Sequence, residues 1–263
     1  MKCYWLIFTS TLQRALIYRA RIFTYAFINT STPLVMIAIW SKYYASGGKV
    51  RGFTYQELLG YYIVTVIVTL ISSRVQVNVT DDIKDGELSN FVIKPFNYFA
   101  YRLSWEIAWH TVKLLVFAVP LILILLIAKV DIKLAPDILT ILLGLVAVIG
   151  SYFLSFTMSI LIGTLAFHLT ETTGISNLSD MIRILFTGSA FPLTFFPLVV
   201  RQIIDFTPLK YTIYFPVQVL IGKYALPDIL IGLGIQLLWT IILFFLYNLN
   251  WQAGIKKFSG VGL

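Results

Sequence analysis

Residues 81–101 read DDIKDGELSNFVIKPFNYFAY, and they connect two long apolar segments of the chain. The stretch contains six of the 32 charged residues of the chain (20 basic and 12 acidic), which are Asp81, Asp82, Lys84, Asp85, Glu87 and Lys94. A Gly-Glu-Leu sequence and a Lys-Pro pair also lie within it. This concentration of charge in one connection indicates a segment with a defined structure and a role of its own.

The order of residues in this stretch predicts a short helix, a break and a second helix. Asp81 and Asp82 favour the start of the short helix, and Gly86 is placed to end it. Pro95 ends the next stretch, because the residue before a proline avoids the helical region. Asn97 then suits the N-cap of a helix that continues into the next apolar segment. A solvated linker would not need the apolar residues that are also present, namely Phe91, Val92, Ile93, Phe96, Tyr98 and Phe99. A segment of this shape is one that a partner can hold.

Composition places the chain in a membrane. Of its 263 residues, 59% are hydrophobic and 12% are charged, whereas a soluble domain is about 45–50% apolar and about 25% charged. We therefore expect a single transmembrane domain over residues 1–263. The net charge is +8 at pH 7, but the basic residues flank apolar segments, which favours membrane lipids over nucleic acid as their partner.

The sequence gives no support for a metal site or for catalysis in this chain. Cys3 is the only cysteine, which excludes a disulfide framework and a thiol metal site. His110 and His168 are far apart and are more typical of interfacial helix ends. The acids of 81–87 form the only acidic cluster, and they lack metal-binding periodicity.

The apolar segments predict an all-α integral membrane fold. A bilayer core of about 30 Å takes about 20 helical residues, and six segments qualify, at about 22–44, 55–79, 107–128, 138–168, 174–191 and 229–247. Residues 2–20 read as an amphipathic helix that lies in the headgroup plane, since Trp5, Phe8 and Leu12 recur at helical spacing. The alternative for 2–20 is a cytoplasmic extension of the first span.

Six spans place both termini on one side of the membrane. With the N-terminus inside, 12 of the 20 lysines and arginines lie on the inner side and eight on the outer side. This modest bias favours cytoplasmic termini, and it makes residues 80–106 the longest inward-facing connection.

Residues 192–227 form a second irregular segment, on the opposite side of the predicted membrane. Five prolines interrupt it, and each proline inside a helix costs about 3 kcal/mol, so one long helix is excluded. The segment is also too apolar for a solvated loop. We expect short helices that re-enter the outer leaflet, where irregular backbone is tolerated only against protein or water.

Three features together resemble the permease subunits of type-2 ATP-binding-cassette exporters. They are six spans behind an interfacial helix, a proline-rich segment after span five (GSAFPLTFFP), and a loop between spans two and three of the form D-x-x-x-G-x-L…K-P. The loop residues that match are Asp82, Gly86, Leu88, Lys94 and Pro95. The resemblance covers essentially the whole chain in order, and within that family it is similar to the multidrug or viologen exporter branch.

The resemblance implies a dimer of permeases, identical or paralogous, in the cell membrane of a prokaryote, with two cytoplasmic ATPase subunits. The loop after span two would be the coupling helix that an ATPase groove receives. That role falls on Asp81, Asp82, Lys84, Asp85, Gly86 and Glu87, together with Lys94 and Pro95. Arg14 and Arg19 of the interfacial helix would brace the same contact, and the re-entrant helices would close the outer end of the path.

Nucleotide chemistry is expected on the partners and not on this chain. The sequence has no G-x-x-x-x-G-K-[ST] motif, and SGGKV at 46–50 lacks the upstream glycine. ATP and magnesium are therefore assigned to separate ATPase subunits, and the chain is expected to be a non-enzymatic subunit. The resemblance implies export of a hydrophobic or amphipathic substrate such as a drug, a lipid-like molecule or a peptide.

Polar residues inside the predicted spans are candidates for the substrate path. Asn29, Thr32 and Pro33 indicate a path-lining or dimer-seam helix with a hinge; the alternative is that hydroxyl groups bond back to their own helix around the kink. Asp180 and Arg183, three residues apart, suit an ion pair at an inner gate or a polar access point for substrate. The alternative is a headgroup-level pair that anchors the helix.

Two further patterns concern packing and the outer gate. Five small residues recur at four-residue steps, which lets another helix approach closely, either within the chain or at a dimer seam; they are Ala147, Ser151, Ser155, Ser159 and Gly163. Phe191, Phe195 and Phe196 suit an outer gate or an apolar binding site, and an interfacial aromatic belt is the alternative.

Two other classes of membrane protein fit the sequence less well than a permease. An ion-coupled secondary transporter should show inverted repeats and acidic residues at mid-bilayer depth, and the sequence shows no convincing repeat. A membrane enzyme would need clustered histidines or acids facing a cavity, and the only acidic cluster, at 81–87, alternates with a lysine in a loop that lacks metal-binding periodicity.

Overall fold

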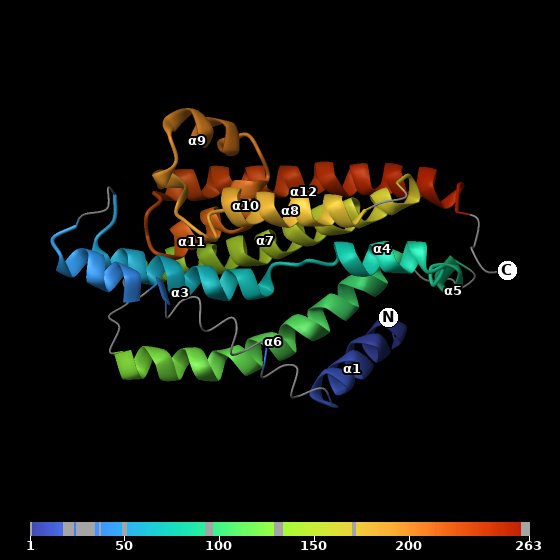
Figure 1. Cartoon of the computed structure of the whole chain (residues 1–263), viewed down its shortest axis with the longest axis horizontal. Coiled ribbons are helices and arrows are strands. Elements are labelled where there is room, and N and C mark those ends of the chain that lie inside the picture. The colour runs from blue at the N-terminus through green and yellow to red at the C-terminus, as the bar shows by residue number, and fades with distance from the viewer. Residues whose placement is uncertain are drawn as a thin grey trace.

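The computed structural model of the protein describes residues 2–17, 24, 35–36, 38–48, 52–92, 97–128, 134–169 and 172–258. These residues form helices joined by turns and no β-strand, which confirms the all-α class. The long helices run along one direction, so the molecule has two ends (Figure 1). One end carries α4 (Gln76–Lys84) and α5 (Ser89–Val92), and the other carries α9 (Leu198–Asp205) and α11 (Tyr214–Leu220) (Figure 1).

Four helical stretches are long and apolar enough to cross a membrane. Each has 30 residues, and they are Tyr55–Lys84, Tyr98–Ile127, Ile138–Phe167 and Leu226–Ile255. They overlap four of the six predicted spans. Most of predicted span 22–44 lies outside the described residues, although 38–45 are helical. Predicted span 174–191 corresponds to α8 (Thr173–Phe186), which has only 14 residues. At 1.5 Å per residue α8 is about 21 Å long, so six crossings remain a prediction.

The helix predicted over 55–79 is interrupted at residues 72–75. α3 (Tyr55–Ile71) ends there, and α4 (Gln76–Lys84) begins five residues before Asp81, the expected start. Two serine side chains of α7 form the hydrogen bonds that the Ser73 backbone would otherwise make within a continuous helix. Its N–H donates to Ser155 Oγ at 3.2 Å, and its carbonyl accepts from Ser159 Oγ at 2.9 Å. The hydrophobic periodicity of the sequence does not reveal this break, because residues distant in the sequence satisfy its backbone N–H and carbonyl groups.

α6 (Tyr98–Ala128) and α7 (Ile138–Thr164) follow the predictions closely. Asn97 caps α6, since its Oδ1 accepts from the Ala100 N–H at 3.1 Å, and this confirms the predicted cap. α6 bends along its length (Figure 1), and it contains Pro120. Asp137 caps α7 by accepting from Thr140, and the hydrogen bond from the Thr140 hydroxyl lowers the pKa of the Asp137 carboxyl.

α7 lies at the centre of the packing and contacts α4, α11 (Tyr214–Leu220) and α12 (Leu226–Ile255). All five residues of its small-residue stripe are buried inside the chain. A Cβ added at Gly163 would lie 2.6 Å from Val79 Cβ, so glycine permits the approach of α4. Gln236, 2% exposed, donates to the carbonyls of Ala147 and Tyr211 and fastens α12 to α7.

Residues 193–220 form short helices, as the five prolines predict. These are the 3₁₀ turn η2 (Leu193–Phe195), α9 (Leu198–Asp205), α10 (Leu209–Thr212) and α11. Pro192, Pro197 and Pro208 each precede a helix directly, and Pro227 lies in the first turn of α12. α11 is buried in the core, whereas α9 projects from the end of the molecule (Figure 1). Re-entry of this segment into a bilayer remains a prediction.

Candidate functional site

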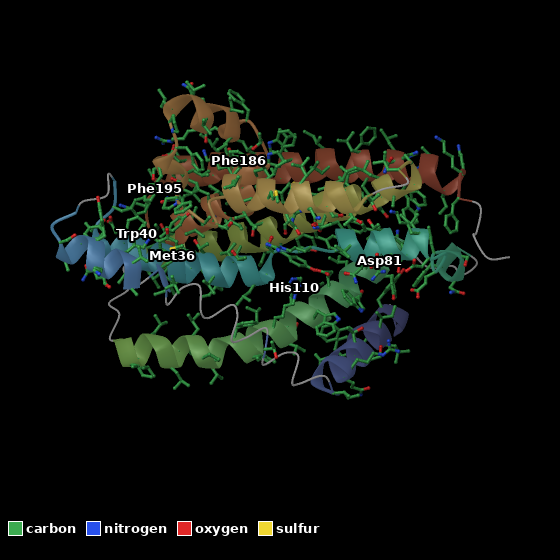
Figure 2. All side chains as sticks on the ribbon, viewed as in Figure 1. Met36, Trp40, Asp81, His110, Phe186 and Phe195 are labelled. Carbon is green, nitrogen blue, oxygen red and sulfur yellow. The ribbon has the colours of Figure 1, made fainter. Side chains whose placement is uncertain are left out.

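The charged connection lies at the end of the molecule that carries α4 and the four-residue helix α5 (Ser89–Val92). Asp81, Lys84, Asp85 and Glu87 are exposed there. Figure 2 shows Asp81 on α4, far along the molecule from Trp40 and Phe195 at the other end. These four side chains form an exposed charged surface at the place where the sequence predicts a contact with a partner. Lys94 and Pro95 lie outside the described residues.

Asp82 has a different position from its charged neighbours. It is 5% exposed, and both Arg102 and Tyr98 of α6 hydrogen-bond to its carboxylate. Arg102 also donates to the Asn78 carbonyl at 3.1 Å. This cluster, here named the α4–α6 clamp (Asp82, Tyr98 and Arg102), turns the carboxylate of Asp82 away from solvent. Asp82 therefore holds the connection in place, in contrast to the contact surface to which sequence analysis assigned it.

Gly86 ends α4, as the sequence predicts. Its φ of 75° is in the left-handed region that glycine tolerates best. The chain then folds back, because the Leu88 N–H donates to the Asp82 carbonyl at 2.8 Å and the Leu88 side chain is fully buried. Ser89 Oγ donates to the Gly86 carbonyl at 2.6 Å. The turn is thus fixed on the clamp by its own backbone.

A recess of about 350 Å³ adjoins this turn and reaches α12. Its lining is mainly aromatic, and the rings of Tyr98 and Trp251 stack with centroids 4.7 Å apart. The other residues of the lining are Leu88, Phe91, Asn97, Phe99, Phe244, Tyr247, Asn248 and Ile255. The same ring of Tyr98 therefore contacts α12 while its hydroxyl bonds Asp82, so the connection is coupled to the last long helix.

The N-terminal helix α1 (Lys2–Ile17) packs along α6 beside the connection. Leu12 contacts the cluster around Val112, and the Asn97 N–H donates to the Tyr4 hydroxyl at 3.2 Å. Trp5 is 65% exposed, which fits a helix whose other face meets lipid headgroups. Arg14 is exposed on the same helix, and Arg19 lies outside the described residues.

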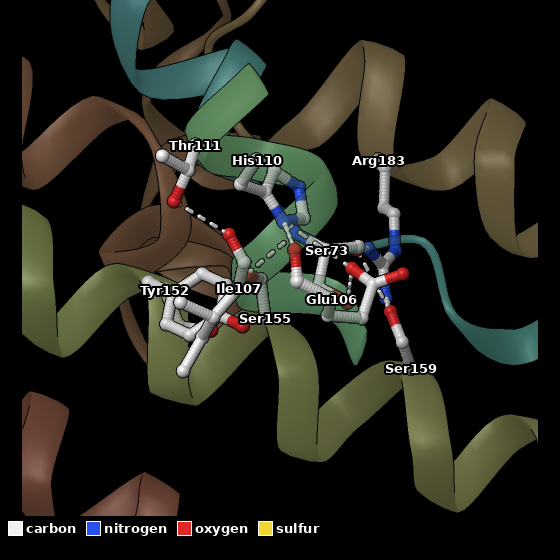
Figure 3. A network of polar contacts seen from close by, with 9 residues as sticks. All are labelled: Ser73, Glu106, Ile107, His110, Thr111, Tyr152, Ser155, Ser159 and Arg183. Carbon is white, nitrogen blue, oxygen red and sulfur yellow. Dashed lines mark hydrogen bonds and ion pairs between the residues drawn. The ribbon is translucent and has the colours of Figure 1, made fainter. Parts of the chain in front are cut away.

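A buried polar network surrounds the break between α3 and α4 (Figure 3). Ser73 Oγ donates to the Glu106 carboxylate at 2.9 Å. His110 Nδ1 donates to the backbone carbonyl of Glu106 at 2.7 Å and lies 3.5 Å from its carboxylate. Glu106 is 6% exposed and His110 is 4% exposed. Glu106 is not among the candidates predicted from the sequence, although a lone acid inside an apolar helix is a signal that identifies such a residue.

Asp180 and Arg183 reach different partners. Arg183 Nη1 donates to the Ser73 carbonyl at 2.9 Å and Nη2 to Ser159 Oγ at 2.7 Å. Asp180 accepts from Gln76 Nε2 at 3.2 Å. Both residues therefore bind the α3–α4 break, and α8 is held there by polar contacts on two successive turns.

The outer candidates gather at the opposite end of the molecule. Phe195 meets Trp40 edge to face with ring centroids 5.9 Å apart (Figure 2). The ring centroids of Phe196 and Phe186 are 6.0 Å apart. Phe191 is 43% exposed. The residues predicted in the first span, Asn29, Thr32 and Pro33, lie outside the described part of the chain.

Comparison with known families agrees with this architecture, which is that of a multi-pass helical membrane protein. Residues 27–262 match the model described as ABC-2 family transporter protein. Because the match covers most of the chain, the protein belongs to the ABC-2 family of membrane permeases. A comparison with curated proteins found no match. Among the described residues, no group of three or more histidine, cysteine or acidic side chains could hold a metal ion.

Proposed function

We propose that the chain is the permease subunit of an ATP-driven exporter for a hydrophobic or amphipathic substrate. Two permease chains would form the path, and two separate ATPase subunits would supply ATP hydrolysis at the cytoplasmic end. In this proposal the chain crosses the membrane six times with both termini inside. The family match supports an ABC permease, and the resemblance to the multidrug or viologen branch supports export.

The observation that carries the proposal is the contrast within one short helix. Asp82 is buried in the α4–α6 clamp, while Asp81 and Lys84 beside it are exposed. Because the clamp fixes this charged surface to α6, and Tyr98 also contacts α12, a movement of the partner can be transmitted to both helices. A free loop would yield to the push without moving the helices.

Charge reversal on the exposed surface tests this proposal. We expect a variant with Asp85→Lys and Glu87→Lys to fold normally, because both side chains are exposed, and to lose at least about tenfold in ATP-driven transport. Tenfold corresponds to about 1.4 kcal/mol, which two reversed contacts can supply. The measurement is transport in vesicles that contain the chain and its ATPase.

A matched control reverses two exposed charges at the same end of the molecule but outside the charged connection. It carries Lys256→Glu and Lys257→Glu, directly after α12. An equal loss of transport in the control and in the Asp85/Glu87 variant would contradict a specific contact between the charged connection and the ATPase. Unchanged transport by the Asp85/Glu87 variant would show that the connection has no part in coupling ATP hydrolysis to transport.

A second candidate function is ion-coupled transport, and the buried carboxyl of Glu106 favours it. A proton carrier needs an acid inside the membrane. The two functions separate in vesicles: a proton ionophore abolishes ion-coupled transport, whereas only withdrawal of ATP abolishes transport by the proposed permease.

A further inference from the structure

A small polar recess lies at the α3–α4 break, on the side that faces α8 and α10. Its volume is about 20 Å³, which is room for one water or for the oxygen edge of one small group. The polar lining includes Thr69, Ser72, Arg74, Arg183, Thr187 and Ser189. Thr212 and two apolar residues, Ile184 and Ile213, complete the lining, and no aspartate or glutamate belongs to it. The polar side chains around the recess are therefore hydroxyls and guanidinium donors.

Arg183 is the most deeply buried charge at this recess. It is 6% exposed, and while its two terminal nitrogens bind Ser73 and Ser159, its Nε has no partner. The hydroxyl of Thr69 is also buried without a partner. A buried polar group that makes no hydrogen bond is unfavourable, so two unpartnered groups on one recess indicate a ligand that is polar.

The charge balance selects the kind of ligand. Within the described part of the chain, neither Arg74 nor Arg183 has a carboxylate within the 4.0 Å of an ion pair. The two nearby acids are engaged elsewhere, Asp180 with Gln76 and Glu106 with Ser73. Two guanidinium groups that share one recess repel each other unless an anion lies between them, and arginine binds phosphate and carboxylate oxygens with particular strength.

We propose that this recess binds a single anionic group, a phosphate or a carboxylate, through Arg74, Arg183 and the Thr69 hydroxyl. The depth of the recess fits a headgroup. α3 has 17 residues and so rises about 26 Å, which places the break almost one bilayer core away from the start of α3. The anion comes either from a phospholipid or from a soluble molecule in the adjoining water. This inference concerns binding alone and does not depend on export.

The test measures anion binding to the purified full chain after lipid has been removed. The probes are phosphatidylglycerol, zwitterionic phosphatidylcholine and inorganic phosphate, each titrated while the thermal unfolding midpoint is followed. We expect phosphatidylglycerol to raise the midpoint, and Arg74→Gln to weaken its apparent affinity about tenfold. Thr69→Val removes one hydroxyl and should weaken the affinity about threefold.

Arg74 is chosen because it is exposed, whereas a change at Arg183 would also break its bonds to Ser73 and Ser159. The matched control is Arg201→Gln on α9, outside the recess, for which we expect no change in affinity. Protection by phosphatidylglycerol alone identifies a lipid headgroup, and equal protection by inorganic phosphate identifies a soluble anion. Equal affinities of the Arg74 and Arg201 variants, or equal protection by phosphatidylcholine, would overturn the proposal.

Discussion

The two ends of the molecule both carry irregular segments, and they differ in the polar contacts that hold these segments. At the α4–α5 end, the buried ion pair between Asp82 and Arg102 fixes a connection whose other side chains are charged and exposed. At the α9–α11 end, many ring and apolar contacts hold the segment. They form a buried apolar cluster that includes Tyr61, Tyr214 and Leu193. The α4–α5 end therefore adds a deeply buried ion pair to its own apolar cluster, which includes Val79, Leu88 and Tyr98. The other end combines apolar and ring contacts with an ion pair that is only partly buried, Lys223–Glu57.

This difference suits different tasks. A segment that must present charge to a partner cannot bury its own side chains, so it needs a strong internal bond to stay in place. A segment that seals a path can bury almost everything, because no soluble partner has to reach it. The predictions below separate the two arrangements by the loss of stability at single residues.

The largest expected effect is at the clamp. Arg102→Met leaves the Asp82 carboxylate buried without its cation, and removal of one partner of a buried ion pair costs about 3–5 kcal/mol. The measurement is the chemical unfolding of the solubilised protein. Adding Asp82→Asn to this variant should restore part of the loss, because the unpaired charge is then gone.

Lys256→Met, which removes an exposed cation near the end of α12, provides the control and should change stability by less than about 0.5 kcal/mol. If Arg102→Met were equally mild, stability at this end would not reside in the clamp.

The next effect concerns the close approach of α7 and α4. A Cβ at Gly163 would meet Val79 Cβ at 2.6 Å and the Gln76 carbonyl at 2.9 Å. Gly163→Ala should therefore destabilise the protein by about 1–3 kcal/mol, despite the better helix propensity of alanine. Gly234→Ala in α12, where nothing lies within 4 Å, should be neutral or stabilising in the same unfolding assay. A neutral Gly163→Ala would show that the two helices separate easily.

Structural features that depend on neighbouring residues were predicted correctly from the sequence. Features that depend on residues far away in the sequence were not. The Asn97 cap, the stop at Gly86 and the division of residues 193–220 into short helices depend on neighbouring residues alone, and the structure has them where they were expected. The break at 72–75 depends on Ser155, Ser159 and Arg183, which are more than 80 positions away. The inward turn of Asp82 was missed for the same reason, because its partner is on α6.

At the α9–α11 end a single aromatic residue should matter less than Arg102. Phe195 contacts Trp40 but is 37% exposed, so Phe195→Ala should cost about 1–2 kcal/mol, less than the about 3–5 kcal/mol of a fully buried phenylalanine. Phe206→Ala, at a side chain 83% exposed, is the matched control and should have almost no effect. A loss at Phe195 as large as that at Arg102 would contradict this difference between the two ends.

The smallest effect is expected at the start of α3, where Thr54 and Glu57 form a capping box. The Glu57 N–H donates to Thr54 Oγ1 at 3.3 Å, and the Glu57 carboxylate also accepts from Lys223 Nζ at 2.6 Å. Thr54→Ala removes only the first of these bonds and should cost about 1 kcal/mol, while Thr54→Ser should restore the cap. Because Lys223 would still hold Glu57 in the alanine variant, a larger loss would mean that this end, too, depends on a single residue.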